Sequence, residues 1–261
     1  MSAGGGLAAS AGGGIAATDL TDTDPTDRPP PSGWLEHNGT LRSRYMHGPV
    51  GWTVVKPRGS LHGTVFCLHG YEANHRFAFD DVHVPEAAHQ VGLQVAVAAV
   101  DGGADSYWHK RSDGNDALAM LLDEFVPLVR GMVGKLPQAV MGWSMGGYGA
   151  LLAAERARAQ FVAVAPASPA IWLTPGATAP GAFDSPADFY ANDIFDDLGP
   201  LRGMAIAVAC GTSDPFYMAT SALVSRMDYP HSVFFGPGSH DATYWASVAP
   251  DQLRAIAPVF H

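Results

Sequence analysis

Positive charge is scarce in this sequence. The 261 residues include 15 lysines and arginines against 25 aspartates and glutamates, which gives a net charge of −10. Proteins that bind nucleic acids or anionic membranes need a basic surface, so the composition argues against both classes. We expect no nucleic-acid partner and predict a small or neutral partner molecule instead.

Cysteine and long apolar runs are also scarce. The only cysteines, Cys67 and Cys210, each lie in or beside a short apolar run typical of a buried strand, so we expect no disulfide. Two cysteines cannot form a zinc set, and His75, His83 and His89 have no carboxylate at a defined spacing, so we expect no metal and no cofactor. No apolar run reaches the length of a membrane-spanning helix, which predicts no integral membrane contact.

The first 33 residues differ from the rest. The stretch SAGGGLAASAGGGIAATD is either the later part of an export signal, with cleavage near Ala17, or an Ala/Gly-rich tail. We favour the first interpretation, which predicts a secreted or envelope-associated protein, whereas the second predicts a cytoplasmic one. A polar, proline-rich stretch follows and indicates an extended linker. Residues 1–33 are therefore predicted to be a signal remnant and linker, and residues 34–261 a single folded domain.

Strand and helix patterns alternate after Trp34. Short apolar runs bounded by glycine or proline predict strands, and apolar residues at helical spacing predict helices. The predicted strands lie within 52–57, 64–70, 92–103, 137–143, 160–168, 204–211 and 231–236, and the predicted helices within 116–133, 146–157, 220–227 and 251–260. This alternation indicates the α/β class, with a mostly parallel sheet covered by helices on both faces. Residues 169–203 interrupt the alternation of strand and helix patterns, which predicts a lid-like or pocket-forming insertion.

The stretch VMGWSMGGYGALLAAE holds a candidate nucleophile, Ser144, between two glycines. One G-x-S-x-G motif alone is only suggestive in a glycine-rich chain, where Ser144 can simply be a small turn residue. Here a predicted strand precedes the motif and a predicted helix follows it, which is the context that exposes a serine hydroxyl on a sharp turn. The flanking glycines relieve the crowding of such a turn. We therefore predict that Ser144 is a nucleophile.

A serine nucleophile requires a base and a carboxylate that orients the base. In the strand-turn-helix context the order along the chain is serine, acid, histidine, each just beyond a strand. Asp214 follows the predicted strand 204–211, and His240 follows the predicted strand 231–236. His231 precedes that strand and falls at the wrong edge of the sheet. We predict Asp214 as the acid and His240 as the base, while Asp196 and Asp197 are expected to cap local turns.

The developing oxyanion needs hydrogen-bond donors as well. The backbone N–H of Met145, the residue after the nucleophile, is the first candidate. The second should come from the loop after an earlier strand, where Tyr71 follows Gly70 in FCLHGYEAN. We predict that the amides of Tyr71 and Met145 form the oxyanion hole.

Four residues are candidates for substrate binding. Tyr107, Trp108 and His109 follow a strand at the predicted catalytic edge, where the two aromatic rings can stack on a substrate and His109 can bind a hydroxyl. Trp172 in the insertion can line an acyl or aryl pocket. Packing of these side chains inside the protein is an equally open alternative.

GWSMGGYGAL, CGTSDPFY and GSHDATYW together resemble the esterase D, or putative-esterase, family of α/β-hydrolases over about residues 50 to 260. That family includes S-formylglutathione hydrolases, feruloyl esterases and the antigen 85 mycolyltransferases. The resemblance implies the α/β-hydrolase fold and the roles predicted above for Ser144, Asp214, His240, Tyr71 and Met145. Gly146-Gly147 at the elbow departs from the antigen 85 pattern and argues against mycolyl transfer.

The sequence thus predicts a cofactor-free serine carboxylesterase that acts on a small-molecule ester, with a carbohydrate or aryl ester as candidates. Two alternatives remain at this stage. An acyltransferase would pass the acyl group to a sugar, and a secreted binding protein would keep the fold without catalysis. An intact Ser, Asp and His in the right order argues against the binding protein, because a binding scaffold needs none of the three.

Overall fold

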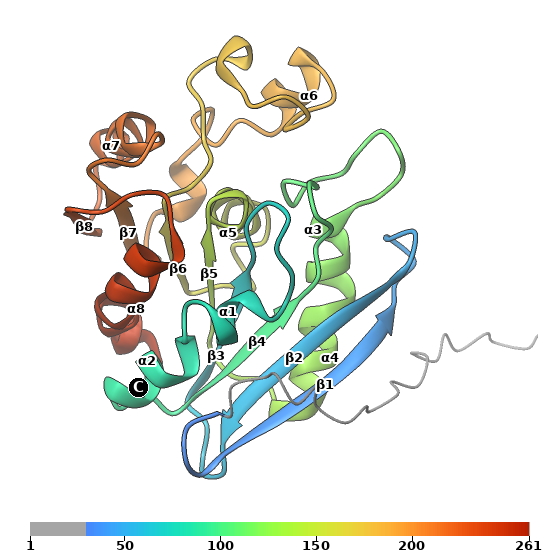
Figure 1. Ribbon diagram of the computed structural model, residues 1–261, viewed down its shortest axis with the longest axis vertical. Helices are drawn as coiled ribbons and strands as arrows, with labels where there is room; N and C mark the ends of the chain where they lie inside the picture. Colours follow the sequence, from blue (N-terminus) through green and yellow to red (C-terminus); the bar gives the residue numbers. More distant parts are fainter. Residues whose placement is uncertain (1–29, 261) are drawn as a thin grey trace, which may run out of the picture.

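An eight-stranded sheet forms the centre of the computed structural model, which describes residues 30–260 (Figure 1). The predicted signal remnant lies outside the described residues. The strands are β1 (Trp34–Arg42), β2 (Pro49–Pro57), β3 (Gly63–Leu68), β4 (Val95–Val100), β5 (Gln138–Trp143), β6 (Ala163–Ala167), β7 (Ala205–Gly211) and β8 (Ser232–Gly236). Their spatial order is β1-β2-β4-β3-β5-β6-β7-β8. β1 pairs with β2 and β2 with β4 in antiparallel fashion, and all other pairs are parallel.

Helices connect the parallel strands. They are α1 (Phe77–Asp80), α2 (Val84–Gln90), α3 (Ala117–Met120), α4 (Val126–Val133), α5 (Met145–Arg156), α6 (Pro186–Ala191), α7 (Tyr217–Arg226) and α8 (Ala242–Ile256). A π-helical turn (Leu121–Phe125) joins α3 to α4, and 3₁₀ turns occupy Pro175–Ala177, Gly199–Leu201 and Ala257–Phe260.

The helices cover both faces of the sheet and create two apolar cores. Figure 1 shows α1, α2 and α8 on one face, with α3, α4 and α5 on the other. Residues in the central strands point alternately to each side, so Val65 and Cys67 join one core while Phe66 and Leu68 join the other. A parallel sheet buried on both faces requires near-continuous apolar strands, and every residue of β3, β4, β5 and β6 is buried.

The predicted alternation is confirmed, but the short helices α1, α2 and α6 were not predicted, and both ends of the chain differ from the prediction. β1 was not predicted, because as an edge strand it buries only Trp34, Gly39 and Leu41 and shows no period-two apolar pattern. The last helix begins at Ala242 rather than at residue 251, and it runs through Pro250. Asp241 caps its start by accepting a hydrogen bond from the backbone N–H of Tyr244 (2.9 Å).

The parallel strands all end at one edge of the sheet, where the loops with the candidate residues gather. The insertion between β6 and β7 lies above this edge, with α6 at the top of Figure 1. Cys67 and Cys210 are buried in β3 and β7, as predicted. Among the helices of residues 30–260, none has the length and apolar character needed to cross a membrane.

Candidate active site

Ser144 lies on the sharp turn between β5 and α5. Its backbone adopts φ 55° and ψ −118°, a conformation that costs energy in a residue with a side chain. The turn fits only because its flanking residues lack a Cβ. A Cβ on Gly142 would overlap the carbonyl of Gly146, and one on Gly146 would overlap the carbonyl of Leu68. The predicted strand, glycine-flanked turn and helix are therefore all present.

Hydrogen bonds connect Ser144 with His240 and Asp214. The Nε2 atom of His240 lies 2.8 Å from Ser144 Oγ, and its Nδ1 atom lies 2.8 Å from Asp214 Oδ2. An ionised carboxylate can only accept, so Nδ1 carries the proton and Nε2 is left to accept from the serine hydroxyl. The three residues come from loops that follow β5, β7 and β8, and they meet at the predicted edge. His231 precedes β8, and its Nδ1 contacts the carbonyl of Tyr229 instead.

Asp214 is buried, but its surroundings favour the ionised form of its carboxyl group. Burial raises the pKa of its carboxyl group, but hydrogen bonds from His240, Ser168 and the backbone N–H of Phe216 outweigh this effect and lower the pKa below its usual value. The Phe216 N–H donates to Oδ1 over 2.8 Å. The side chain of Asp214 is fully buried, whereas that of His240 is 25% exposed, so only the base is open to a substrate.

The loop after β3, which carries Tyr71, approaches Ser144 at Gly70. A Cβ at Gly70 would lie 3.6 Å from Ser144 Cβ, so the chain at Gly70 passes directly against the nucleophile. Met145 is the first residue of α5, where backbone N–H groups have no partner within the helix. The two amides predicted as oxyanion donors therefore belong to segments that adjoin the serine.

His69 fixes this loop in a way that the sequence did not reveal. Its Nε2 atom accepts from the N–H of Gly102 (2.9 Å), so Nδ1 carries the proton and donates to the carbonyl of Gly70 (2.8 Å). Burial lowers the pKa of His69, which keeps the ring neutral and able to accept. Trp108 supports the same loop, because its Nε1–H donates to the carbonyl of His69 (3.2 Å).

Three of the four predicted substrate-binding residues, Tyr107, Trp108 and His109, are buried, and the surroundings of Trp108 and His109 contradict their expected role. Trp108 is fully buried and packs against Gly102 and Gly149, where any side chain would collide with its ring. His109 is 1% exposed, stacks on Phe183 and contacts the carbonyl of Ala182 through Nε2 (3.2 Å). Neither ring has a free face for a substrate. Burial of these rings was the alternative left open by the sequence.

Tyr107 and Trp172 belong to an aromatic wall that leads away from the candidate base. We define this aromatic wall as Tyr107, Trp172, Phe183 and Phe216. The ring of Phe216 lies 5.3 Å from that of His240, and Trp172 lies 5.4 Å from Phe216. Tyr107 is 6% exposed and contacts Trp172 at 5.8 Å. Trp172 is partly exposed, so the structure keeps it as a candidate for contact with a substrate.

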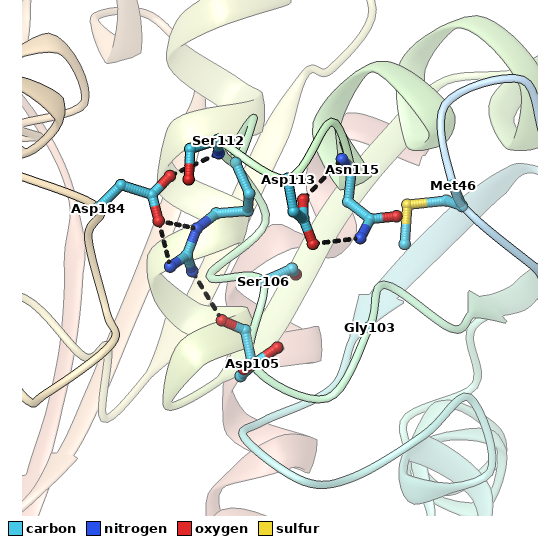
Figure 2. Close-up of a pocket in the computed structure, with 9 residues that line it drawn as sticks. Met46, Gly103, Asp105, Ser106, Ser112, Asp113, Asn115 and Asp184 are labelled. Atoms are coloured by element: carbon cyan, nitrogen blue, oxygen red, sulfur yellow. Dashed lines mark hydrogen bonds and ion pairs between the residues drawn. The ribbon is translucent and has the colours of Figure 1, made fainter.

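A polar pocket joins the insertion to the loop after β4 (Figure 2). It has a volume of about 150 Å³. Asp184 of the insertion pairs with Arg111 (2.9 Å) and accepts from the N–H of Ser112, and Asp113 accepts two hydrogen bonds from Asn115. Most polar groups of the pocket thus form hydrogen bonds with one another. The contacts of Asp184 with Arg111 and Ser112 attach the insertion to the loop after β4.

His75 has a carboxylate partner that the sequence spacing did not indicate. Its Nδ1 atom lies 2.8 Å from Asp101 Oδ1, and Asp101 also accepts from the backbone N–H groups of His75 and Gly51. The pair attaches the loop after β3 to the ends of β2 and β4. Across residues 30–260, no group of three His, Cys, Asp or Glu side chains is arranged to hold a metal ion.

The sheet order, the serine turn and the converging loops together define an α/β-hydrolase. The model of the putative esterase family matches residues 45–248, and the chain belongs to this family. Membership places it among the carboxylic ester hydrolases, as predicted. No curated protein matches the chain.

Several solved structures share the fold at low sequence identity. A ferulic acid esterase superposes with a TM-score of 0.74 at 19% identity, covering 87% of this chain and 99% of its own. An S-formylglutathione hydrolase from Agrobacterium tumefaciens gives 0.72 at 15% identity, with 88% and 96% covered. The fluorophosphonate-binding serine hydrolase F of Staphylococcus aureus gives 0.70 at 18% identity, with 87% and 99% covered. These similarities support the α/β-hydrolase fold predicted from the sequence.

Proposed function

We propose that the protein is a serine carboxylesterase that works through an acyl-enzyme on Ser144. The observation that carries this proposal is the continuous hydrogen-bonded chain from Ser144 Oγ through His240 to Asp214, with 2.8 Å at each step. A serine hydroxyl becomes a competent nucleophile only when an oriented base removes its proton. This chain supplies both the base and the group that orients it.

The reaction follows from these positions. Ser144 Oγ attacks the ester carbonyl while His240 Nε2 takes the hydroxyl proton, and the amides of Tyr71 and Met145 donate to the resulting oxyanion. Collapse of this intermediate breaks the bond to the alcohol, which leaves with the proton from His240. Water then attacks the acyl-enzyme with His240 again as base, and the acid is released as Ser144 regains its proton.

A fluorophosphonate tests the nucleophile directly. Attack by Ser144 on the phosphorus expels fluoride and leaves a stable phosphonyl ester, because the tetrahedral product imitates the intermediate of ester hydrolysis. We expect one adduct per chain, located by peptide mass spectrometry on the peptide that contains Ser144. A chain that forms no adduct and hydrolyses no 4-nitrophenyl ester would contradict the proposal and favour a non-catalytic binding protein.

The acyl group of the substrate is proposed to lie along the aromatic wall. Phe216 contacts the ring of the base, and Trp172 continues the wall towards Tyr107. Tyr107 is only 6% exposed, so the partly exposed Trp172 and Phe216 form the part of the wall that a substrate can reach. An acyl chain held between the base and the oxyanion hole would meet aromatic faces, which favours an aryl or other apolar acyl group.

Trp172→Ala should lower activity selectively on aromatic acids. We expect kcat/KM for 4-nitrophenyl benzoate to fall about tenfold, the effect of losing ~1.4 kcal/mol of aromatic contact, while the value for 4-nitrophenyl acetate changes about twofold or less. Leu173→Ala is the control, because Leu173 is adjacent in sequence but 52% exposed. Equal losses on both esters would assign Trp172 to folding rather than to the acyl site.

A further inference from the structure

The candidate base, His240, contacts two aromatic rings that come from different elements. The centroid of the Phe216 ring, in the residue before α7, lies 5.3 Å from that of the imidazole, with an interplanar angle of 52°. The ring of Trp245 in α8 lies 5.0 Å from the imidazole at 86°, an edge-to-face arrangement. We call Phe216 and Trp245 the ring pair. Only Phe216 also belongs to the aromatic wall.

The indole of Trp245 is held in one orientation. Its Nε1–H donates to Ser168 Oγ over 2.9 Å in a buried contact, and the residue is only 6% exposed. Its ring also packs against that of Phe77, with the centroids 5.9 Å apart. Because a hydrogen bond is directional, turning the indole away from His240 would break the bond to Ser168.

Phe216 is fixed through its backbone and its ring. Its N–H donates to Asp214 Oδ1 (2.8 Å), and its carbonyl accepts from the N–H of Thr220 (2.8 Å). The ring lies 5.4 Å from that of Trp172. The backbone of Phe216 is therefore tied to the carboxylate that orients the base, while its ring contacts the base itself.

The two hydrogen bonds of His240 leave one motion of its ring unrestrained. The bonds to Asp214 and Ser144 are made by the two ring nitrogens, so both lie close to the plane of the imidazole. They fix the two nitrogens but allow the ring to tilt about the line that joins them. Rings packed against the imidazole oppose this tilt, because a close-packed interior has no free volume into which the imidazole could turn.

The proposed reaction removes one of these hydrogen bonds at a critical step. Once the proton has moved to His240 and Ser144 Oγ is bonded to the acyl carbon, the serine no longer donates to Nε2. The same Nε2 must then deliver its proton to the leaving alcohol. At this stage the bond to Asp214 and the contacts with the ring pair are what keep the imidazole in position.

We propose that Phe216 and Trp245 are positioning residues that hold the imidazole of His240 while its Nε2 atom exchanges Ser144 Oγ for the oxygen of the leaving alcohol. This inference rests on the proposed function, because it assigns a role in the same reaction. Trp245 is buried and lies outside the aromatic wall, so the cost of losing its ring should appear in kcat rather than in KM.

Trp245→Leu and Trp245→Phe test the ring pair. Leucine keeps an apolar side chain beside His240 but removes the aromatic ring, whereas phenylalanine keeps a ring. We expect kcat on 4-nitrophenyl acetate to fall about tenfold in Trp245→Leu, the upper range for losing an aromatic contact, with KM changed by about twofold or less. Trp245→Phe should recover most of this loss and stay within about threefold of the wild type.

Trp34→Leu is the matched control. Trp34 is 7% exposed and also makes an edge contact with a histidine, His89, at 6.4 Å. It pairs with Pro57 at the edge of the sheet opposite the candidate active site. Its replacement should therefore leave kcat within about twofold of the wild type, whatever it does to stability.

A double-mutant cycle with His240 separates positioning from general damage. In a His240→Ala background there is no imidazole to hold, so Trp245→Leu should change the residual kcat by no more than about twofold. Thermal unfolding of each variant shows which of them keep the fold. If Trp245→Leu does not fold, Phe216→Leu carries the same comparison, because it removes the other ring and keeps the N–H that donates to Asp214.

Two results would overturn the ring pair and leave the esterase proposal standing. One is a wild-type kcat in the folded leucine variant, and the other is an equal loss with and without His240. Full activity in Ser144→Ala, measured alongside, would overturn the esterase proposal itself and the ring pair with it.

Discussion

Ser144→Ala should lower kcat for 4-nitrophenyl acetate by about 10⁵- to 10⁶-fold, the effect seen when a triad nucleophile is removed from a serine hydrolase. The reason is that no other group occupies the position from which Oγ attacks, 2.8 Å from His240 Nε2. His240 and the oxyanion amides remain in place, so a small residual rate above that of free ester should persist. The measurement is the release of 4-nitrophenol at matched protein concentrations.

Ser225→Ala is the matched control for this substitution. Ser225 is exposed, lies in α7, and donates its hydroxyl only to the carbonyl of Ser221 in the same helix (2.8 Å). Its loss should leave kcat within about twofold of the wild type, as for surface changes remote from the site. If Ser144→Ala kept the wild-type rate under these conditions, the nucleophile would have to be sought elsewhere in the chain.

The turn that carries Ser144 could be predicted because all the sequence features that form it lie within one short segment. A strand, two flanking glycines and a helix are all encoded within residues 138–156, and the structure forms them there. The positions of Asp214 and His240 could also be inferred, since each follows a strand and all parallel strands end at the same edge. The order of elements thus brings together residues separated by nearly 100 positions in the chain, and Ser144 and His240 are 96 apart.

The burial of the Trp108 and His109 side chains could not be predicted in the same way. Trp108 is buried because Gly102 and Gly149 leave room for its ring, and Gly149 belongs to a helix distant in sequence. His109 is covered by Phe183 of the insertion, a segment without regular periodicity. Exposure of an aromatic residue in a loop depends on which segments fold over it, and this information is not contained in the neighbouring sequence.

The hydrogen bonds between Ser168 and Trp245 and between His69 and Gly102 could not be predicted from the sequence, for a related reason. Ser168 and Trp245 are 77 positions apart, and neither belongs to a motif that specifies the other. His69 and Gly102 meet only because β3 and β4 are neighbours in the sheet. Sequence patterns locate the groups that carry the chemistry, whereas the residues that orient them depend on packing between elements.

Asp214→Asn should lower kcat by about 10⁴-fold with little change in KM, the typical effect of replacing the triad acid by its amide. In the wild type the lowered pKa of Asp214 keeps the carboxylate ionised at neutral pH, so it always accepts from His240 Nδ1–H. An amide NH₂ aimed at Nδ1 would instead favour the tautomer with the proton on Nε2, which cannot accept from Ser144.

Asp228→Asn is the control for the change of charge, because Asp228 is 76% exposed and pairs with Arg202 on the surface. It should retain the wild-type kcat, as exposed ion pairs contribute little. Both variants should bind the ester equally well, since Asp214 is buried behind His240 and does not face the substrate. A selective loss in Asp214→Asn at constant KM would therefore place its contribution in the proton transfer itself. A rise in KM with unchanged kcat would mean that Asp214 shapes the binding site and that another group orients the base.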